Sequence, residues 1–254
     1  MLSQQRYDYI VEQIEKNGSV TVTDVAAALS VSIETIRRDL IMLETHGKLK
    51  RVFGGAVAID RPKHFTSFES RLDKNTAFKA ELSQYAISFI DNGDTIFLES
   101  GSTATEMAKL LITYDLDIII ITHSNTVFNI LKSKYRVVLI GGEYIKEDDC
   151  FGGNLTVEFL KNFHVNKAFV FPSALSAQHG IESFLIQTMS IEKLIPTISD
   201  KVFVLADSEK FGARAMFKVM DLDPEFIYVT DSHISGEVKE EFAENGLVLV
   251  SGEQ

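Results

Sequence analysis

Apolar residues near the N-terminus recur at helical spacing in three consecutive segments. The first segment follows Ser3, a possible helix cap, and ends at Asn17-Gly18. Its apolar positions are spaced i, i+3, i+4 and i+7 and comprise Tyr7, Ile10, Val11 and Ile14. This spacing puts four apolar side chains on one face and predicts an amphipathic helix.

Two more helices are predicted, each with its own polar cap. Thr21 and Asp24 form a start like a capping box for the stretch from Val22 to Leu29. Ser30-Val31-Ser32 is the turn that follows, and Ser32 caps a third helix with Gly47 as its left-handed stop. The stripe of the third helix that we expect to face inward comprises Ile33, Ile36, Leu40 and Leu43.

A short hairpin is expected after the third helix. Leu49 to Phe53 and Ala56 to Ile59 alternate enough to form two strands around Gly54-Gly55. Three helices followed by such a wing make a winged helix-turn-helix, which we assign to residues 1–59.

The rest of the chain alternates apolar, strand-like runs with helical stretches. Near-continuous β-branched runs predict an α/β domain with a mostly parallel sheet covered on both faces. We place this domain at residues 81–254, after a linker and first helix in residues 60–80. The runs are Thr95–Glu99, Ile118–Thr122, Val137–Ile140, Lys167–Phe171, Val202–Ala206 and Phe226–Thr230.

Charge divides the chain unevenly. Residues 1–57 hold seven Lys/Arg and seven Asp/Glu, so the formal net charge of −11 lies entirely in the remainder. No apolar run reaches the roughly 18 residues of a membrane span, and the N-terminus does not resemble a signal peptide. The single cysteine, Cys150, fits a reducing compartment. We therefore expect a cytoplasmic protein in which any contact with a polyanion is made by the neutral N-terminal segment.

The outward face of the third helix carries groups suited to DNA. Small hydroxyls and cations on a helix in the major groove would meet base edges and phosphates, although a merely solvated face is the alternative. On this helix the candidates are Ser32, Glu34, Thr35, Arg37 and Arg38, and on the wing they are Lys48, Lys50 and Arg51.

Small polar residues follow several of the strand-like runs. Ligands in open α/β sheets bind at the carboxyl ends of strands, and hydroxyls around a glycine at a helix start can bind phosphate, although an ordinary serine cap is the alternative. Lys210 could meet a phosphate and Asp207 a sugar hydroxyl. The candidates are Ser100, Gly101, Ser102, Thr103, Thr105, Asn125, Gly141, Gly142, Asp207 and Lys210.

The stretch TVTDVAAALSVSIETIRRDLIMLETHGKLKRVFGGAV resembles the N-terminal motif of the DeoR family of bacterial transcription regulators. The stretches FLESGSTATEMA, LIGGEY and VLADSEKFG resemble the sensor domain of that family, which is similar in fold to ribose-5-phosphate isomerase. The resemblance implies a repressor that binds operator DNA as a homodimer or homotetramer and is released by a phosphorylated sugar. It implies that the phosphate is held by Ser100, Gly101, Ser102, Thr103 and Thr105, with Lys210 as a second contact.

The sequence departs from the family pattern in three places. Phe53 replaces the histidine that commonly precedes the two glycines, Pro172 to Gly180 keeps only the last glycine of a glycine-rich turn, and Met189 to Pro196 has only Lys193 in place of a Lys-Arg pair. The first departure affects a DNA contact of the wing, and the other two make an unusual ligand, or weak binding of the common one, an alternative.

An isomerase-like enzyme built on Glu99, Asp207 and Lys210 is the competing class of function. A DNA-binding head has no evident use on such an enzyme, and no distinctive acid pair is present. His123 and His179 lack a third metal ligand at recognisable spacing. We therefore expect that the protein is not an enzyme and that it binds neither a metal nor a cofactor.

Overall fold

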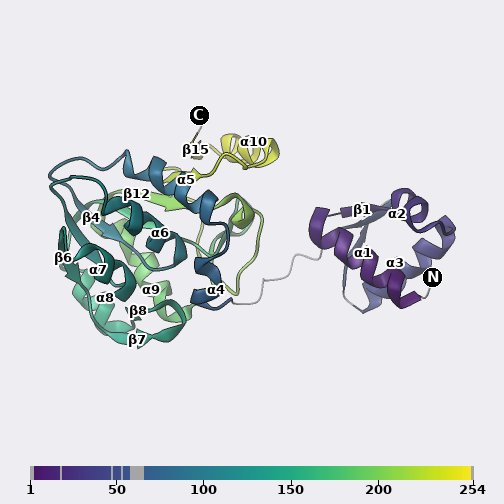
Figure 1. Ribbon diagram of the computed structural model, residues 1–254, viewed down its shortest axis with the longest axis horizontal. Helices are drawn as coiled ribbons and strands as arrows, with labels where there is room; N and C mark the ends of the chain where they lie inside the picture. The colour runs from purple at the N-terminus through teal and green to yellow at the C-terminus, as the bar shows by residue number, and fades with distance from the viewer. Residues whose placement is uncertain (1–2, 18, 47, 53, 58–65, 253–254) are drawn as a thin grey trace. The chain divides into compact units, whose positions relative to one another are not determined.

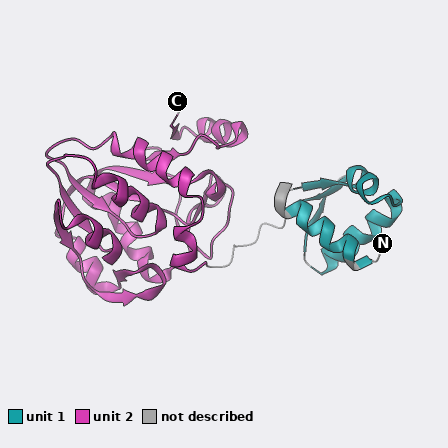
Figure 2. Cartoon of the chain, in the orientation of Figure 1, with its two compact units in different colours: residues 1–61 teal, residues 62–254 magenta. Residues whose placement is uncertain are grey.

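The computed structural model describes residues 3–17, 19–46, 48–52, 54–57 and 66–252. The chain divides into two compact units, residues 1–61 and 62–254, which Figure 2 shows in teal and magenta. We call them the head and the sensor unit and describe each by itself. Phe53, a departure from the family pattern, and Gly47, the predicted helix stop, lie outside the described residues, as does the predicted end of the head at residue 59. The predicted start of the sensor domain at residue 81 falls within a helix that spans Thr76–Ile87.

The head contains the three predicted helices and a small antiparallel sheet. The helices are α1 (Ser3–Asn17), α2 (Val22–Leu29) and α3 (Ile33–Thr45), and the strands are β1 (Ser19–Thr21), β2 (Lys50–Val52) and β3 (Gly55–Val57). Two of the predicted caps are present, because Thr21 and Ser32 each accept a hydrogen bond from the backbone N–H three residues on. Ser3, the third predicted cap, is instead the first residue of α1. The sequence did not indicate β1, which makes the sheet three-stranded in the order β1-β3-β2.

Gly55 explains why the wing needs its second glycine. A Cβ atom at this position would lie 2.0 Å from the carbonyl oxygen of Val20 in β1. Only glycine lets the two backbones approach this closely. The second glycine is therefore a requirement of sheet packing in the head.

The core of the head corrects one predicted stripe. Ile36, Leu40 and Leu43 are buried as expected, but Ile33 is 44% exposed because it is the first residue of α3 and lies beyond the packed turns. Asp39 occupies the inward face instead and is 4% exposed. Its carboxylate is paired with Arg6 of α1, at 2.6 Å from Nε and 2.9 Å from a terminal nitrogen.

The sensor unit is built on a seven-stranded sheet whose paired strands all run parallel, in the order β15-β14-β12-β9-β4-β5-β6 (Figure 1). All six predicted runs are strands of this sheet, and β15 is the one that the pattern missed. The strands are β4 (Thr95–Leu98), β5 (Ile119–Thr122), β6 (Arg136–Leu139), β9 (Val165–Val170), β12 (Ser199–Leu205), β14 (Ile227–Thr230) and β15 (Val248–Ser251). The predicted α/β class is confirmed.

Helices cover both faces of this sheet. One face packs on α5 (Thr76–Ile87), α6 (Ser102–Leu111) and α7 (Asn125–Leu131), through residues such as Leu82, Met107 and Leu131. The other face packs on α8 (Asn154–Leu160), α9 (Ile186–Leu194) and α10 (Gly236–Glu244), through Leu160, Ile191 and Phe242. Neighbouring residues of β4 alternate between the two cores, since side chains along a strand point to opposite faces. No described helix is long and apolar enough to cross a bilayer.

Shorter elements complete the sensor unit. A three-stranded antiparallel sheet consists of β10 (Ala174–Ser176), β11 (Gly180–Ser183) and β13 (Phe217–Met220), and a two-stranded one of β7 (Glu143–Ile145) and β8 (Cys150–Gly152). The altered loop at residues 172–180 leads into and connects β10 and β11. Short helices are α4 (Phe68–Leu72), η1 (Lys146–Asp148), η2 (Ile195–Ile198) and η3 (Ser208–Lys210).

Candidate nucleic-acid interface and effector pocket

The outward face of α3 presents the predicted cations to solvent. The side chains of Arg37 and Arg38 are 65% and 78% exposed. Glu34, on the preceding turn, lies 3.7 Å from Arg37 and 3.9 Å from Arg38. Ion pairs this exposed contribute little stability, so both guanidinium groups can exchange Glu34 for a phosphate at small cost.

Ser32 and Thr35 lie at the first turn of the same helix. The Ser32 hydroxyl accepts from the Thr35 N–H at 3.2 Å, and the two hydroxyls are 2.8 Å apart. Ser32 therefore determines where α3 begins, and its exposed position lets the same hydroxyl face a base or a phosphate.

The wing carries the other predicted cations. Lys48 and Lys50 are exposed, whereas Arg51 is 3.7 Å from Glu44 of α3. The backbone N–H of Arg51 also donates to the Glu44 carboxylate at 2.8 Å. Glu44 thus fixes β2 against the end of α3, which holds the wing cations beside the helix.

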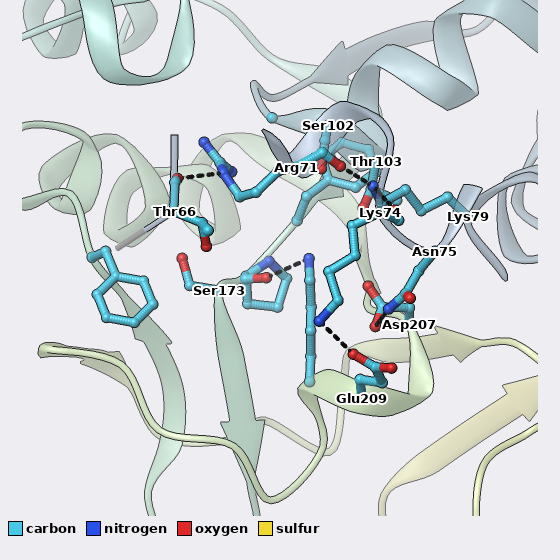
Figure 3. Close-up of a pocket in the computed structure, with 15 residues that line it drawn as sticks. Thr66, Arg71, Lys74, Asn75, Lys79, Ser102, Thr103, Ser173, Asp207 and Glu209 are labelled. Carbon is cyan, nitrogen blue, oxygen red and sulfur yellow. Dashed lines mark hydrogen bonds and ion pairs between the residues drawn. The ribbon is translucent and has the colours of Figure 1, made fainter. Parts of the chain in front are cut away.

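A solvent-open cavity lies at the carboxyl ends of β4, β9 and β12 (Figure 3). These strands are neighbours in the sheet, so the loops that follow them meet. The segment from Thr66 to α5 and Phe184, between β11 and α9, supply the rest of the wall. The lining residues are Thr66, Arg71, Lys74, Asn75, Lys79, Gly101, Ser102, Thr103, Phe171, Pro172, Ser173, Phe184, Asp207, Glu209 and Lys210.

The loop after β4 has the features of an anion site. Gly101 has a φ of 113°, which favours glycine, and it begins α6 without a side-chain cap. The first amides of a helix have no intrahelical acceptor and carry its positive dipole end. Thr103 is 1% exposed, and its hydroxyl has no hydrogen-bond partner within the described structure. A bound oxyanion would satisfy both the amides and this hydroxyl.

Cations outnumber carboxylates in the cavity wall. The lining contains Arg71, Lys74, Lys79 and Lys210 against Asp207 and Glu209, an excess of two positive charges in a chain of net charge −11. An excess of this size is equal and opposite to the charge of a phosphate dianion.

Two of these lysines are held by backbone oxygens. Lys79 donates to the carbonyl groups of Arg71 and Lys74, and Lys210 donates to the Pro172 carbonyl at 2.9 Å. Burial, followed by the nearby charge of Lys210, lowers the pKa of Lys79 to about 8. Burial likewise lowers the pKa of Lys210. A bound anion would offset both effects and favour the charged lysines.

Polar groups and two aromatic rings line the remainder of the cavity. Asn75 donates to the Asp207 carboxylate at 3.2 Å, and Lys74 is 2.7 Å from Glu209. The rings are those of Phe171 and Phe184. Carboxylate, amide and aromatic groups together suit a polyol, whose hydroxyls donate while its C–H faces pack on a ring.

The structure brings five of the ten predicted effector residues together in this wall: Gly101, Ser102, Thr103, Asp207 and Lys210. Ser100 lies on the same loop and Thr105 in the first turn of α6, but their hydroxyls donate to Asp148 at 2.7 Å and to the Gly101 carbonyl at 3.0 Å, respectively. They hold the shape of the loop.

The other three predicted residues do not line the cavity. Asn125 donates to Asp149 at 3.1 Å, and a Cβ atom on Gly142 would lie 2.0 Å from the Thr156 hydroxyl. Gly141 is exposed on the same turn. They follow β5 and β6, which continue the sheet on the side of β4 away from β9 and β12. The prediction used the chain order of strand ends and could not include their order in the sheet.

Ten of the fifteen lining residues were not predicted as ligand contacts, and the four that matter most for charge and hydrogen bonding lie in the segment assigned to the linker and first sensor helix. These are Arg71, Lys74, Asn75 and Lys79, on or between α4 and α5. The available signal was the density of cations in RLDKNTAFKA, within an otherwise acidic sensor unit.

The histidines considered as metal ligands have other roles. His123 is buried, its Nδ1 lies 2.7 Å from the Phe151 carbonyl oxygen, and burial lowers its pKa. The Nε2 atom of His179 is 3.1 Å from Arg214. Among the described residues, no three His, Cys, Asp or Glu side chains come together as a possible metal site.

Known proteins similar to this chain agree on one family. The profile of the DeoR-like helix-turn-helix domain matches residues 6–62, and that of the DeoR C terminal sensor domain matches residues 74–232. The lactose phosphotransferase system repressor of Lactococcus lactis subsp. lactis is 32% identical over 254 residues, covering 98% of this chain and 99% of its own. The HTH-type transcriptional repressor GlcR of Bacillus subtilis (strain 168) is 27% identical, covering 100% and 98%.

Solved structures with a similar sheet are more distant. Ribose 5 phosphate isomerase A from Neisseria gonorrhoeae is 14% identical, with a TM-score of 0.42 over 56% of each chain.

Proposed function

The chain belongs to the DeoR family and is a DNA-binding transcriptional repressor, not an enzyme. We propose that the exposed face of α3 and the wing bind the operator and that a ligand in the sensor cavity releases the repressor from it. The operator is double-stranded DNA, and α3 enters its major groove. The exposed face of α3 is the observation that supports this most strongly, because its cations are exposed and held by no strong ion pair. The protein acts in the cytoplasm.

Each predicted contact has a distinct role on DNA. Thr35 and Glu34, at the first turn of α3, reach base edges, while Ser32, Arg37 and Arg38 contact the flanking phosphates. Lys48, Lys50 and Arg51 contact the backbone or minor groove beside the wing. A homodimer or homotetramer presents paired heads to half-sites about 34 Å apart or a multiple of this.

The effector is a phosphorylated sugar bound in the cavity of the sensor unit. Its phosphate lies on Gly101, Ser102 and Thr103 between Lys79 and Lys210, and its hydroxyls donate to Asp207. Support comes from the excess of two positive charges and from the unpartnered Thr103 hydroxyl. A relative is named a lactose phosphotransferase system repressor, which favours genes of sugar uptake and catabolism as targets. The altered loop at 172–180 flanks the cavity and favours a different sugar from that of relatives with the common turn.

The DNA assignment is tested with the full chain and a binding site selected from random duplexes. Arg37→Ala with Arg38→Ala is expected to flatten the slope of log affinity against log salt by about 2, since each phosphate contact contributes about 0.9. The matched control is Lys132→Ala with Lys134→Ala, which removes two exposed cations from the sensor unit. Unchanged binding by the arginine variant would refute the proposed interface.

The effector assignment is tested by thermal shift against a panel of sugar phosphates and their unphosphorylated parents. A ligand that binds only the folded state raises its melting temperature. We expect a rise with at least one phosphate ester and none with its parent sugar. A rise with unphosphorylated sugars alone would favour a different ligand class.

A further inference from the structure

Arg71 connects the effector cavity to the point where the chain enters the sensor unit. It lies in α4 and lines the cavity. Its Nε donates to the Thr66 carbonyl oxygen at 3.1 Å. Thr66 is the first described residue after 58–65, the segment that joins the head to the sensor unit. Figure 3 shows Arg71 reaching Thr66 at the rim of the cavity.

The same guanidinium is paired with a carboxylate behind the phosphate loop. Arg71 donates to Asp148, and also to the Glu147 carbonyl oxygen at 3.4 Å. Asp148 is 6% exposed and accepts from the Ser100 hydroxyl at 2.7 Å. Ser100 directly precedes the glycine that begins α6. The Arg71–Asp148 pair therefore ties α4 to the loop on which the effector phosphate is proposed to lie.

We propose that Arg71 transmits effector binding to the head, because the anionic group of the effector competes with Asp148 for its guanidinium. This inference rests on the proposed phosphate site. A phosphate offers two acceptor oxygens in the planar geometry that arginine prefers, with more charge than a carboxylate. Asp148 keeps its hydrogen bond from Ser100 when Arg71 leaves. The exchange moves α4 and Thr66, and thus alters the constraint on the segment that carries the head.

Lys74 provides a matched control in the same cavity. It is a cation on the same wall, two residues beyond the end of α4, but its partner Glu209 is half-exposed and belongs to η3. Its amine contacts no group near Thr66 within the described structure. Removing Lys74 weakens phosphate binding without affecting the connection to the head.

The experiment measures operator affinity of the full chain with and without each of two probes, inorganic phosphate and glucose 6-phosphate. The ratio of the two affinities is the coupling, typically about 5- to 150-fold in allosteric proteins. We expect Lys74→Gln to keep the wild-type ratio at saturating probe. Arg71→Gln removes the same pair with or without probe, so its operator affinity should not depend on the probe and the ratio should be near 1, even when calorimetry shows the site to be saturated.

Asp148→Asn tests the exchange from the opposite side. The neutral amide keeps the volume and the contact with Ser100 but releases Arg71, so the probe binds roughly tenfold more tightly. Operator affinity without probe shifts toward the wild-type value measured with probe. This variant decides the proposal if Arg71→Gln fails to fold, as judged by its melting temperature.

The two proposals fail in different ways. A wild-type chain that binds neither probe overturns the phosphate site and the coupling together. The coupling alone is overturned if the wild-type chain binds a probe and its operator affinity responds, but Arg71→Gln keeps the full ratio. The same holds if Asp148→Asn behaves as wild type.

Discussion

The Thr103 hydroxyl is buried at the start of α6 without a hydrogen-bond partner among the described residues, so its removal should affect the free and the bound protein differently. Thr103→Val keeps the shape and eliminates an unsatisfied polar group, which leaves the free protein equally stable or more stable. The melting-temperature rise produced by a phosphate ester should shrink.

Thr105 provides the control for this change. Its hydroxyl donates to the Gly101 carbonyl at 3.0 Å. Thr105→Val should therefore lower stability by about 1 kcal/mol. If Thr103→Val also destabilised the free protein, the hydroxyl would have a structural role.

Lys79 makes effector binding sensitive to pH in a predictable direction. In the free protein the pKa of Lys79 is about 8, and a phosphate beside it raises that pKa. Binding should thus take up a proton above pH 8, and Kd should rise by up to about tenfold per pH unit. The phosphate itself titrates near pH 6 and does not interfere.

Calorimetry in buffers of different ionisation enthalpy measures this uptake directly. Proton uptake should be small at pH 7 and increase toward pH 9. Lys79→Met should reduce it, and uptake that is the same in this variant would place the titrating group elsewhere.

Residues that owe their role to a distant partner were the ones that the sequence could not predict. Asp39 follows two exposed arginines, and nothing nearby in the chain indicates that it is buried against Arg6, 33 positions away. Arg71 is separated from Asp148 by 77 positions. Caps such as Thr21 and Ser32 were predicted correctly because both partners lie within one helical turn.

At the scale of elements, the turn between β6 and β7 contains two glycines: Gly142 is needed for packing, whereas Gly141 can be replaced. A Cβ atom on Gly142 would lie 2.0 Å from Thr156 and 2.6 Å from the Gly152 carbonyl oxygen, whereas one on Gly141 meets nothing within 4 Å. Gly142→Ala should cost about 1 to 3 kcal/mol of sensor stability, as overpacking typically does, and Gly141→Ala very little.

Urea denaturation of the two alanine variants, followed by ligand titration, tests this difference. Both variants should bind the effector with wild-type affinity once folded. A loss of affinity in Gly141→Ala, with stability retained, would return this turn to the ligand site.

Element types were predictable because periodicity and composition are local properties. All six runs are strongly apolar, so each was recognised without reference to its neighbours, including Val137–Ile140 of the edge strand β6, which is only partly buried. The edge strand β15 is partly exposed and follows a polar helix, which weakened its pattern. The order of the strands depends on crossovers that no local pattern records, and this is why three predicted effector residues lie away from the cavity.

At the scale of the whole molecule, the described residues form hydrophobic cores that belong to one unit or the other. One core lies within residues 10–56, and two lie on the faces of the sensor sheet. Scanning calorimetry should therefore resolve two unfolding transitions. A phosphate ester at 100 times its Kd should stabilise only the sensor transition, by about 2.7 kcal/mol.

Asp39→Asn identifies the other transition. It removes the charge that pairs with Arg6 inside the head and should lower the head midpoint alone. A single transition, shifted by both the ligand and this substitution, would show that the two units unfold together.

The burial of Cys150 gives the chain a chemical reporter of its own. The Cys150 thiol is fully buried in β8, so alkylating reagents cannot reach it while the protein is folded. Burial also raises its pKa, so little of the thiol is ionised. Since the sequence has no other cysteine, the rate of alkylation would report how often the region around β8 opens. An effector bound to the loop after β4, whose Ser100 lies beside Cys150, should slow that rate. Alkylation by a maleimide, followed by mass spectrometry, would therefore screen for inducers without operator DNA.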